Sequence, residues 1–426
     1  MKRLFALGVA VVLVTGCASN DGDDPAVGGP GSIEFQVAGD PEEIVVYRSL
    51  VNDFEKSHED IDVNLIDVAD KDDHLTKLST AFTGGNPPDV FLVNFREYSQ
   101  FVVRGALEPV GPHLESMEID TADYYEPPLE AFTFAGELQC MPQNISSLVV
   151  YYNKSLFKKA GVASPSDDWS WEDFRGTAVE LTDGEVRGVG IEPSIIRLAP
   201  FVWTNGGEIV DDPNAPTRFT FDDPAAREAL EFIVGLVRDD QVVPTEQEVT
   251  AAEDLETMFA TGKLGMLLSS RRDTPEFREI TSLKWDVAPL PQESVPSGIL
   301  HSDAYCVAAG SDNHEAALEF ISYAIGEQGQ TITALGGRTV PSRMSVAQSG
   351  AFLNPAEVPS RSQVFLDVIP NIRRTPVIPT WPEIEDVAEE ILTRAFYEDD
   401  YTIDDAITDL EEQTSSLFEE GSSAAE

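Results

Sequence analysis

The order of hydrophobic and polar residues near the start of the chain predicts alternating strands and helices. Apolar residues recur at every second position in 33–37 and again in 61–65, as in β-strands. Apolar residues recur at helical spacing in 44–54 and 75–82, and 90–93 is a continuous apolar run of the kind found in buried parallel strands. A strand–helix–strand–helix–strand order predicts an open, mostly parallel α/β sheet.

Polar residues follow each of these predicted strands. In open α/β sheets, ligands bind beyond the carboxyl ends of the strands. The loops that end the three strands therefore become candidates for a binding site. They contain Asp40, Asp70, Asn94 and Arg96. Asp40 also precedes Pro41, and this pair is typical of a helix N-terminus.

The alternation continues through the rest of the chain. A strand is predicted at 148–152, and Ser170 and Asp173 form a capping box at the start of a helix. Further helices are predicted over 224–236, 317–324 and 384–395. No repeat of fixed period is present in the sequence, which argues against a solenoid or a propeller.

The N-terminus has the pattern of a secretory signal. Lys2 and Arg3 precede an apolar run over 4–14, which is too short to span a bilayer. The run leads into Val-Thr-Gly-Cys, which resembles the bacterial lipoprotein signal and implies cleavage after residue 16 and lipidation of Cys17. The alternative is an ordinary signal peptide with an incidental cysteine. Residues 17–31, rich in Gly, Asp, Pro and Ser, are expected to form a flexible tether.

The charge of the chain narrows the range of partners. Its 426 residues carry 28 Lys plus Arg against 76 Asp plus Glu, a formal charge of −48. Nucleic acid would be repelled by such a chain, and the basic residues form no stripe that would attract anionic lipid. The 42% of hydrophobic residues is too high for a disordered chain. A large, acidic, folded protein is therefore predicted.

Sequence signals for catalysis or for a cofactor are weak. The sequence contains no nucleophile elbow, phosphate-binding loop or dinucleotide-binding glycine pattern. His314-Glu315 begins like a zinc-protease motif, but Leu318 stands where the second histidine would be. Paired acids of the glycosidase kind arise by chance among so many carboxylates. We therefore expect no enzyme activity, no metal and no cofactor.

Several segments match one family pattern in order along the chain. The most specific is 151–161, with Tyr-Asn-Lys, a Phe and an Ala-Gly, followed by Trp-Ser-Trp-Glu-Asp-Phe at 169–174, where Ser170 replaces the usual Thr. Weaker matches lie at 85–90, 205–208, 259–266, 285–291 and 336–341. The ordered set resembles the extracellular solute-binding proteins of bacterial ABC importers, specifically the sugar-binding group that includes maltose-binding protein.

The resemblance implies an α/β fold like the type II periplasmic binding proteins, with two lobes, a hinge and an interlobe cleft. It places the first lobe at 32–141 and 306–356 and the second at 142–305 and 357–420. A small carbohydrate would bind between the lobes and close them, and the protein would deliver it to the transmembrane subunits of a permease. It also implies a monomer, held outside the cytoplasm by its lipid anchor at the cell surface or in the periplasm.

By segment order, the cleft loops of the family fall on fourteen residues of this chain. These are Asp40, Asp70, Asn94, Arg96, Gln143, Asn144, Glu192, Trp203, Ser270, Arg271, His301, Ser302, Tyr305 and Arg338. Trp203 is the strongest stacking candidate, with a buried core tryptophan as the alternative. The amide groups of Gln143 and Asn144 suit sugar hydroxyl groups.

Two further expectations depend on the resemblance. If Arg96, Arg271, Arg272 and Arg338 converge, they favour an anionic carbohydrate-like ligand, such as a sugar phosphate, a glycerol phosphodiester or a uronate, over a neutral sugar. Cys140 and Cys306 fall on neighbouring strands, so a disulfide that restrains the hinge is expected as one alternative and two buried thiols as the other. A secreted glycosidase and an adhesive surface lipoprotein are the alternative functions.

Overall fold

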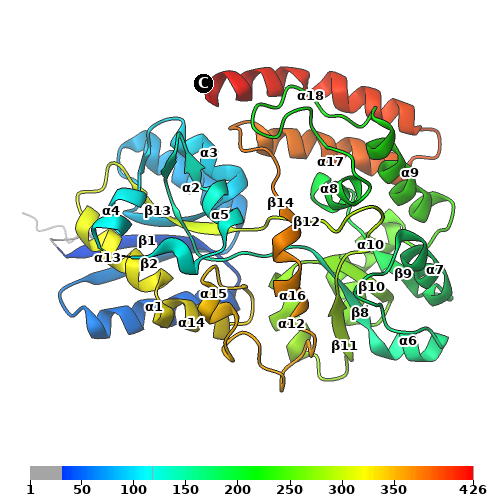
Figure 1. Cartoon of the computed structure of the whole chain (residues 1–426), viewed down its shortest axis with the longest axis horizontal. Helices are drawn as coiled ribbons and strands as arrows, with labels where there is room; N and C mark the ends of the chain where they lie inside the picture. The colour runs from blue at the N-terminus through cyan, green and yellow to red at the C-terminus, as the bar shows by residue number, and fades with distance from the viewer. Residues whose placement is uncertain (1–30, 118, 426) are drawn as a thin grey trace, which may run out of the picture.

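A computed structural model describes residues 31–117 and 119–425. The signal sequence, Cys17 and nearly all of the expected tether lie outside these described residues. The described chain forms two lobes, each built around its own β-sheet (Figure 1). None of the described helices is both long and apolar enough to cross a membrane.

The first lobe contains a six-stranded sheet. Its order is β2-β1-β3-β13-β4, with β7 paired to β13. Parallel pairing joins β1 to β2 and β3, as the sequence pattern predicts, whereas β13 runs antiparallel to β3. The strands are β1 (Ser32–Ala38), β2 (Asp62–Val68), β3 (Val90–Asn94), β4 (Leu107–Glu108), β7 (Met141–Pro142) and β13 (Asp303–Ala308).

Apolar faces of helices cover this sheet. Phe35 of β1 packs in one core cluster with Phe54 of α1 and Phe320 of α13. The helices of this lobe are α1 (Pro41–Ser57), α2 (Lys71–Gly84), α3 (Phe95–Val102), α4 (Gly111–Ser116), α5 (Glu126–Ala131), α13 (His314–Ile325), α14 (Glu327–Leu335) and α15 (Met344–Ala347). A short hairpin, β5 (Thr133–Phe134) and β6 (Glu137–Leu138), lies beside them.

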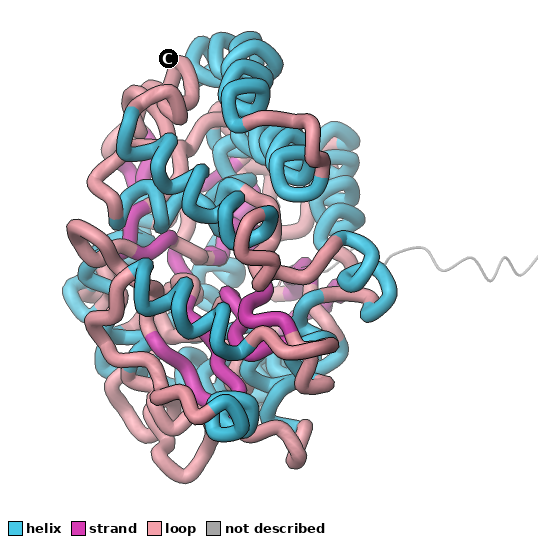
Figure 2. Tube along the Cα trace, turned by 90° about the vertical axis from the view of Figure 1, so that its right-hand side faces the viewer, coloured by secondary structure: helices cyan, strands magenta, loops and turns pink. Residues whose placement is uncertain are grey.

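The second lobe contains a four-stranded sheet in the order β11-β8-β10-β9, with helices around it (Figure 2). The strands are β8 (Val149–Asn153), β9 (Arg187–Gly190), β10 (Leu264–Ser269) and β11 (Trp285–Ala288). The helices are α6 (Lys154–Ala160), α7 (Trp171–Leu181), α8 (Ile195–Thr204), α9 (Pro224–Arg238), α10 (Glu246–Ala252), α11 (Leu255–Ala260), α12 (Thr274–Glu279), α17 (Trp381–Tyr397) and α18 (Ile403–Ala425). The predicted capping box of Ser170 and Asp173 begins α7.

The chain crosses between the lobes three times. It leaves the first sheet after β7, returns from β12 (Gly298–Ile299) into β13, and leaves again between α15 and α16 (Val364–Asp367). β14 (Ile372–Arg373) then pairs with β12 beside the crossings. The first sheet takes in Pro142 and Asp303–Tyr305, which the sequence reading assigned to the second lobe. Periodicity could not locate this boundary, because β7 has only two residues.

Cys140 and Cys306 are joined by a disulfide. The antiparallel register of β7 and β13 pairs Met141 with Tyr305, which brings the two cysteines opposite each other. Both are fully buried, and both belong to the first lobe. The bond therefore fastens β13 to the residue directly before β7, within one lobe, and does not span the two lobes.

Candidate functional site

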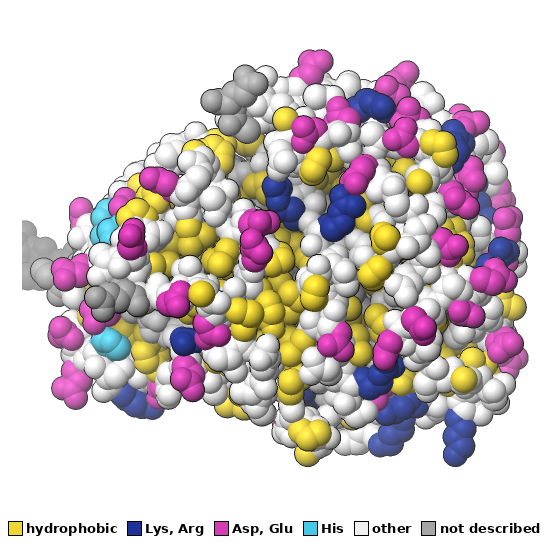
Figure 3. Space-filling view, viewed as in Figure 1, with side chains coloured by type: hydrophobic (Ala, Val, Ile, Leu, Met, Phe, Trp, Pro, Cys, Tyr) yellow, Lys and Arg dark blue, Asp and Glu magenta, His cyan; other side chains and the backbone are white. Residues whose placement is uncertain are grey.

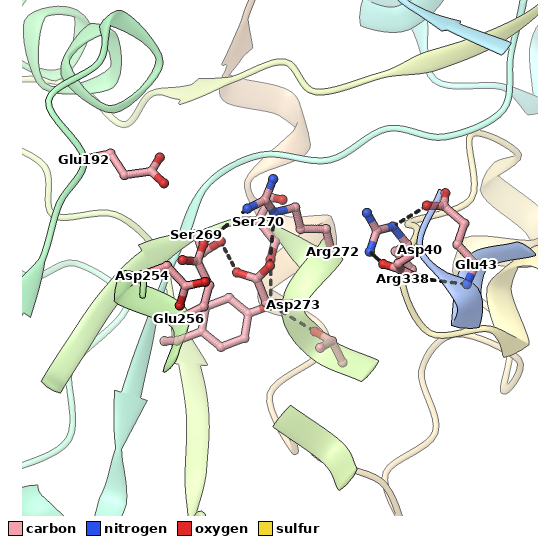
Figure 4. A network of polar contacts seen from close by, with 12 residues as sticks. Asp40, Glu43, Glu192, Asp254, Glu256, Ser269, Ser270, Arg272, Asp273 and Arg338 are labelled. Carbon is pink, nitrogen blue, oxygen red and sulfur yellow. Dashed lines mark hydrogen bonds and ion pairs between the residues drawn. The ribbon is translucent and has the colours of Figure 1, made fainter. Parts of the chain in front are cut away.

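A triad of charged residues marks the first lobe's side of the site. Asp40 ends the loop after β1 and caps α1 by accepting a hydrogen bond from the Glu43 backbone N–H at 2.9 Å. Its other carboxylate oxygen accepts from Arg338 at 2.6 Å, and the Arg338 Nε lies 2.9 Å from the Glu43 carboxylate. One guanidinium group is thus held by two carboxylates, and it points toward the second lobe (Figure 4).

Glu43 is the unusual acid of this triad. Its side chain is 15% exposed. Burial raises its pKa to about 7, opposed by the charge of Arg338 and helped by Asp303 and Asp40. The Tyr47 hydroxyl donates a hydrogen bond to Glu43 at 3.2 Å. This carboxyl group can therefore gain or lose a proton near neutral pH.

An amide network lies behind the triad, around Asp303. Asp303 begins β13 directly opposite Asn94, the last residue of β3. Its two carboxylate oxygens accept hydrogen bonds from Asn94 at 3.1 Å and from Asn144 at 3.0 Å. Asn144 also donates to the Gln143 side-chain oxygen, and Gln143 donates to the Tyr47 hydroxyl. The sequence candidates Asn94, Gln143 and Asn144 thus lie together, about an aspartate that the candidate set lacked.

The second lobe contributes a facing group at the end of β10. Arg272 lies within 3.2 Å of Glu256 and 3.1 Å of Asp273, and Ser269 donates a hydrogen bond to Asp273. Figure 4 shows Glu192 and Arg272 directed toward each other across this group. Glu192 is paired with Arg197 at 2.7 Å.

Two candidates lie where the lobes meet. Arg96 of α3 forms an ion pair with Glu385 of α17 at 2.5 Å. His301 forms an isolated β-bridge with Ser146 in the crossing segments, and its Nε2 atom is buried without a partner among the described residues. Burial, and then cations from both lobes, of which Arg96 and Arg197 are the strongest, hold the pKa of His301 well below its usual value. The imidazole is therefore neutral.

Eight candidates are not placed to contact a ligand in this arrangement, among them Gln143 and Asn144 of the amide network, which are 1% and 6% exposed. Asp70 is exposed and caps α2 through the backbone of Asp72 and Asp73. The remaining five are buried: Trp203, Ser270, Arg271, Ser302 and Tyr305. Their burial removes them from the candidate site, because a ligand cannot reach them without a local rearrangement.

Each of the buried five has a structural role. Trp203 belongs to the second-lobe core, and the guanidinium group of Arg373 covers its ring at 4.9 Å, so the core alternative holds in this arrangement. The Ser270 carbonyl accepts a hydrogen bond from Tyr151, and the Ser302 hydroxyl donates to the Asn144 carbonyl. Tyr305 packs against Phe35 in the first-lobe core.

The four arginines of the anionic-ligand expectation do not converge. Arg271 is 1% exposed and lies between the rings of Phe352 and Phe365, away from the group around Arg272. Arg96 is paired with Glu385, and Arg338 with two acids. The sequence could identify an arginine pair at 271–272, but not which member faces the site, since a short 3-10 turn (η2, Arg271–Asp273) sends neighbouring side chains in different directions.

Two α/β lobes, joined by three crossings and presenting polar side chains to each other, define a two-lobed binding protein. Figure 3 shows that hydrophobic side chains also gather near the middle of one face, with charged side chains around them. The chain belongs to the family of bacterial extracellular solute-binding proteins, whose family model matches residues 39–331. The predicted family and the type II binding-protein fold are thus confirmed. Membership of this extracellular family indicates a site of action outside the cytoplasm.

Individual relatives carry the likeness over most of the chain. An ABC substrate-binding protein of Listeria monocytogenes, solved in complex with cycloalternan, is 26% identical, with a TM-score of 0.84 over 92% of this chain and 100% of that one. The diacetylchitobiose-binding protein DasA of Streptomyces coelicolor is 24% identical, covering 74% of this chain and 73% of that protein. UgpB of Mycobacterium tuberculosis, in complex with glycerophosphocholine, shares the fold at 21% identity, with a TM-score of 0.80 over 92% of this chain and 99% of that one.

Proposed function

We propose that this protein captures a neutral sugar or short oligosaccharide between its lobes and delivers it to the transmembrane subunits of an ABC permease. The contacting residues in this proposal are Asp40, Glu43, Arg338, Glu192, Arg272 and His301. Carboxylates and guanidinium groups suit hydroxyl groups, which both donate and accept hydrogen bonds. The cycloalternan complex of the Listeria protein and the name of DasA support a carbohydrate as the ligand class.

The pairing of the two site arginines carries the choice of a neutral ligand. Arg338 lies between Asp40 and Glu43, and Arg272 between Glu256 and Asp273. Each guanidinium group therefore already has two carboxyl groups beside it. A phosphate or uronate would have to displace a carboxylate or lie beside it, and repulsion between like charges opposes both. A neutral polyol meets no such cost.

A thermal-shift and calorimetry panel tests this proposal. We expect maltose, chitobiose or arabinobiose to raise the melting temperature without being hydrolysed, whereas sn-glycerol 3-phosphate, glycerophosphocholine and galacturonate do not. Arg338→Ala should weaken binding of the stabilising sugar by at least tenfold, and Asp70→Ala should serve as an exposed control without effect. Stabilisation by the anions alone would contradict the neutral ligand, and product formation would indicate a glycosidase.

We also propose that Cys17 carries the lipid anchor and that the protein is a monomer. The sequence before Cys17 supports the first point, and the family resemblance supports the second. Mass spectrometry of the N-terminal peptide should show an acylated Cys17, and Cys17→Ala should release the protein from the membrane fraction. Sedimentation of the released protein at a mass above that of one chain would contradict the monomer.

A further inference from the structure

Arg271 is a buried cation with no acid paired to it in the part of the chain that the structure describes. Among the described ion pairs none includes Arg271, and its side chain lies with the guanidinium carbon 4.5 Å and 5.0 Å from the ring centres of Phe352 and Phe365. Burial lowers its pKa to about 9. An unpaired buried charge costs free energy, and the other contacts of the guanidinium group must offset that cost.

The hydrogen bonds of Arg271 reach across the lobe boundary. Its Nε donates to the Gly337 carbonyl at 2.8 Å, and its Nη1 donates to the Ser362 hydroxyl at 3.4 Å. Arg271 follows β10 in the second lobe. Gly337 follows α14 in the first lobe, where a side chain at the preceding Gly336 would strike Val46 of α1.

These two residues immediately precede the two arginines of the proposed site. Arg272 follows Arg271 and pairs with Glu256, whereas Arg338 follows Gly337 and pairs with Asp40. One hydrogen bond therefore joins the backbone beside one site arginine to the side chain beside the other. Gly337 has φ of +80°, a conformation that favours glycine and turns the chain from α14 toward Arg338.

We propose that Arg271 is a positioning residue. Its hydrogen bond to Gly337 holds the two lobes together and sets the spacing between Arg272 and Arg338. Separation of the lobes would carry Gly337 away and leave the Arg271 Nε without an acceptor between two aromatic rings, which disfavours opening. This role rests on the proposed function in naming the site arginines, but the effect on lobe separation does not require any ligand.

Small-angle X-ray scattering of the ligand-free protein tests the proposal. The Arg271→Met variant keeps an unbranched side chain between the rings but loses both donors, and it should show a larger radius of gyration than the wild type. Arg271→Lys retains the charge and one donor group, and it should give an intermediate value. If Arg271→Met fails to fold, the comparison of Arg271→Lys with the wild type decides the question.

Arg238 supplies a matched control. It also donates to backbone carbonyls, those of Arg394, Glu398 and Tyr401, but all of its partners lie in the second lobe. Arg238→Met should lower the melting temperature and leave the radius of gyration at the wild-type value. An Arg271→Met variant that behaves in the same way would overturn the proposal, because its role would then be structural only. Failure of the sugar panel would refute the proposed function and leave this result unaffected.

Discussion

Arg96 of α3 and Glu385 of α17 form an ion pair at 2.5 Å that joins the first lobe to the second. The Trp381 indole N–H donates to the other Glu385 oxygen at 2.7 Å, and the Arg96 Nε donates to Asn94 at 3.2 Å. The two side chains are only 16% and 15% exposed. Burial raises the pKa of Glu385, and the charge of Arg96 opposes this rise. The ionised form of each side chain is therefore stabilised by the charge of the other.

Removal of one partner should be more damaging than removal of both. Glu385→Gln leaves the Arg96 charge nearly buried without its acid, and we expect a loss of about 3 kcal/mol in the free energy of unfolding. Arg96→Met should cost a similar amount. The double variant Arg96→Met/Glu385→Gln should recover much of the loss, as measured by urea denaturation in a double-mutant cycle. Additive losses would show that the pair is not coupled.

The shifted pKa of Glu43 predicts a pH dependence of stability. Its pKa is about 7 in the folded protein and near 4.5 when exposed. Between these values the folded state holds a proton that the unfolded state has released, so the contribution of Glu43 to stability is present below pH 4.5 and is lost as the pH rises through 7. The loss is at most about 3 kcal/mol.

Glu43→Gln isolates this effect from the other acids. The stability of the wild type relative to Glu43→Gln should fall between pH 4.5 and 7.5, measured as the difference in unfolding free energy at each pH. Glu42→Gln removes the same charge from an exposed neighbour, and it serves as the control for the loss of one acid from α1. A flat difference for Glu43→Gln would show that Arg338 keeps Glu43 ionised.

The fold was largely predictable from sequence because its first lobe begins with local patterns. The spacing of apolar residues predicts each strand and helix between 33 and 93, and the parallel order follows from their alternation. The position of β13 could not be predicted in this way, since it enters the sheet beside β3 after about two hundred intervening residues. The resemblance to a known family supplied that long-range information.

The site was less predictable, because the sequence does not show which of two neighbouring side chains points into the site. Arg271 and Arg272 are chemically identical neighbours, yet one is buried between aromatic rings and the other pairs with acids of the site. Asp303 lies between the candidates Ser302 and Tyr305, at the start of an apolar strand. A polar residue at the first position of a buried strand was the one signal that could have identified it.

Substitution of Trp203 should change the stability of the protein more than its affinity for the ligand. It is 2% exposed in the second-lobe core. Trp203→Ala should lower the free energy of unfolding by about 3–5 kcal/mol through the cavity it leaves. Trp203→Phe fills most of that space and removes an indole N–H that is buried without a partner among the described residues, so its loss should be smaller. Sugar affinity of Trp203→Phe at the wild-type value would place the residue in the core, and a tenfold loss with unchanged stability would return it to the site.

The disulfide should stabilise the first lobe without controlling its movement against the second. Cys140 and Cys306 have a sequence separation of 166 residues. Loss of such a constraint raises the entropy of the unfolded chain, which favours unfolding by up to about 5 kcal/mol at room temperature. Cys140→Ala/Cys306→Ala keeps two small apolar side chains at these buried positions, and its melting temperature should fall below that of the oxidised wild type. The melting temperature of wild-type protein reduced with dithiothreitol should fall to a similar value, while that of Arg175→Ala, which breaks a surface ion pair with Asp240, should change little.

Because both cysteines lie in one lobe, the radius of gyration of the folded protein should be the same with and without the bond. A larger radius after reduction would show that the disulfide restrains the hinge after all.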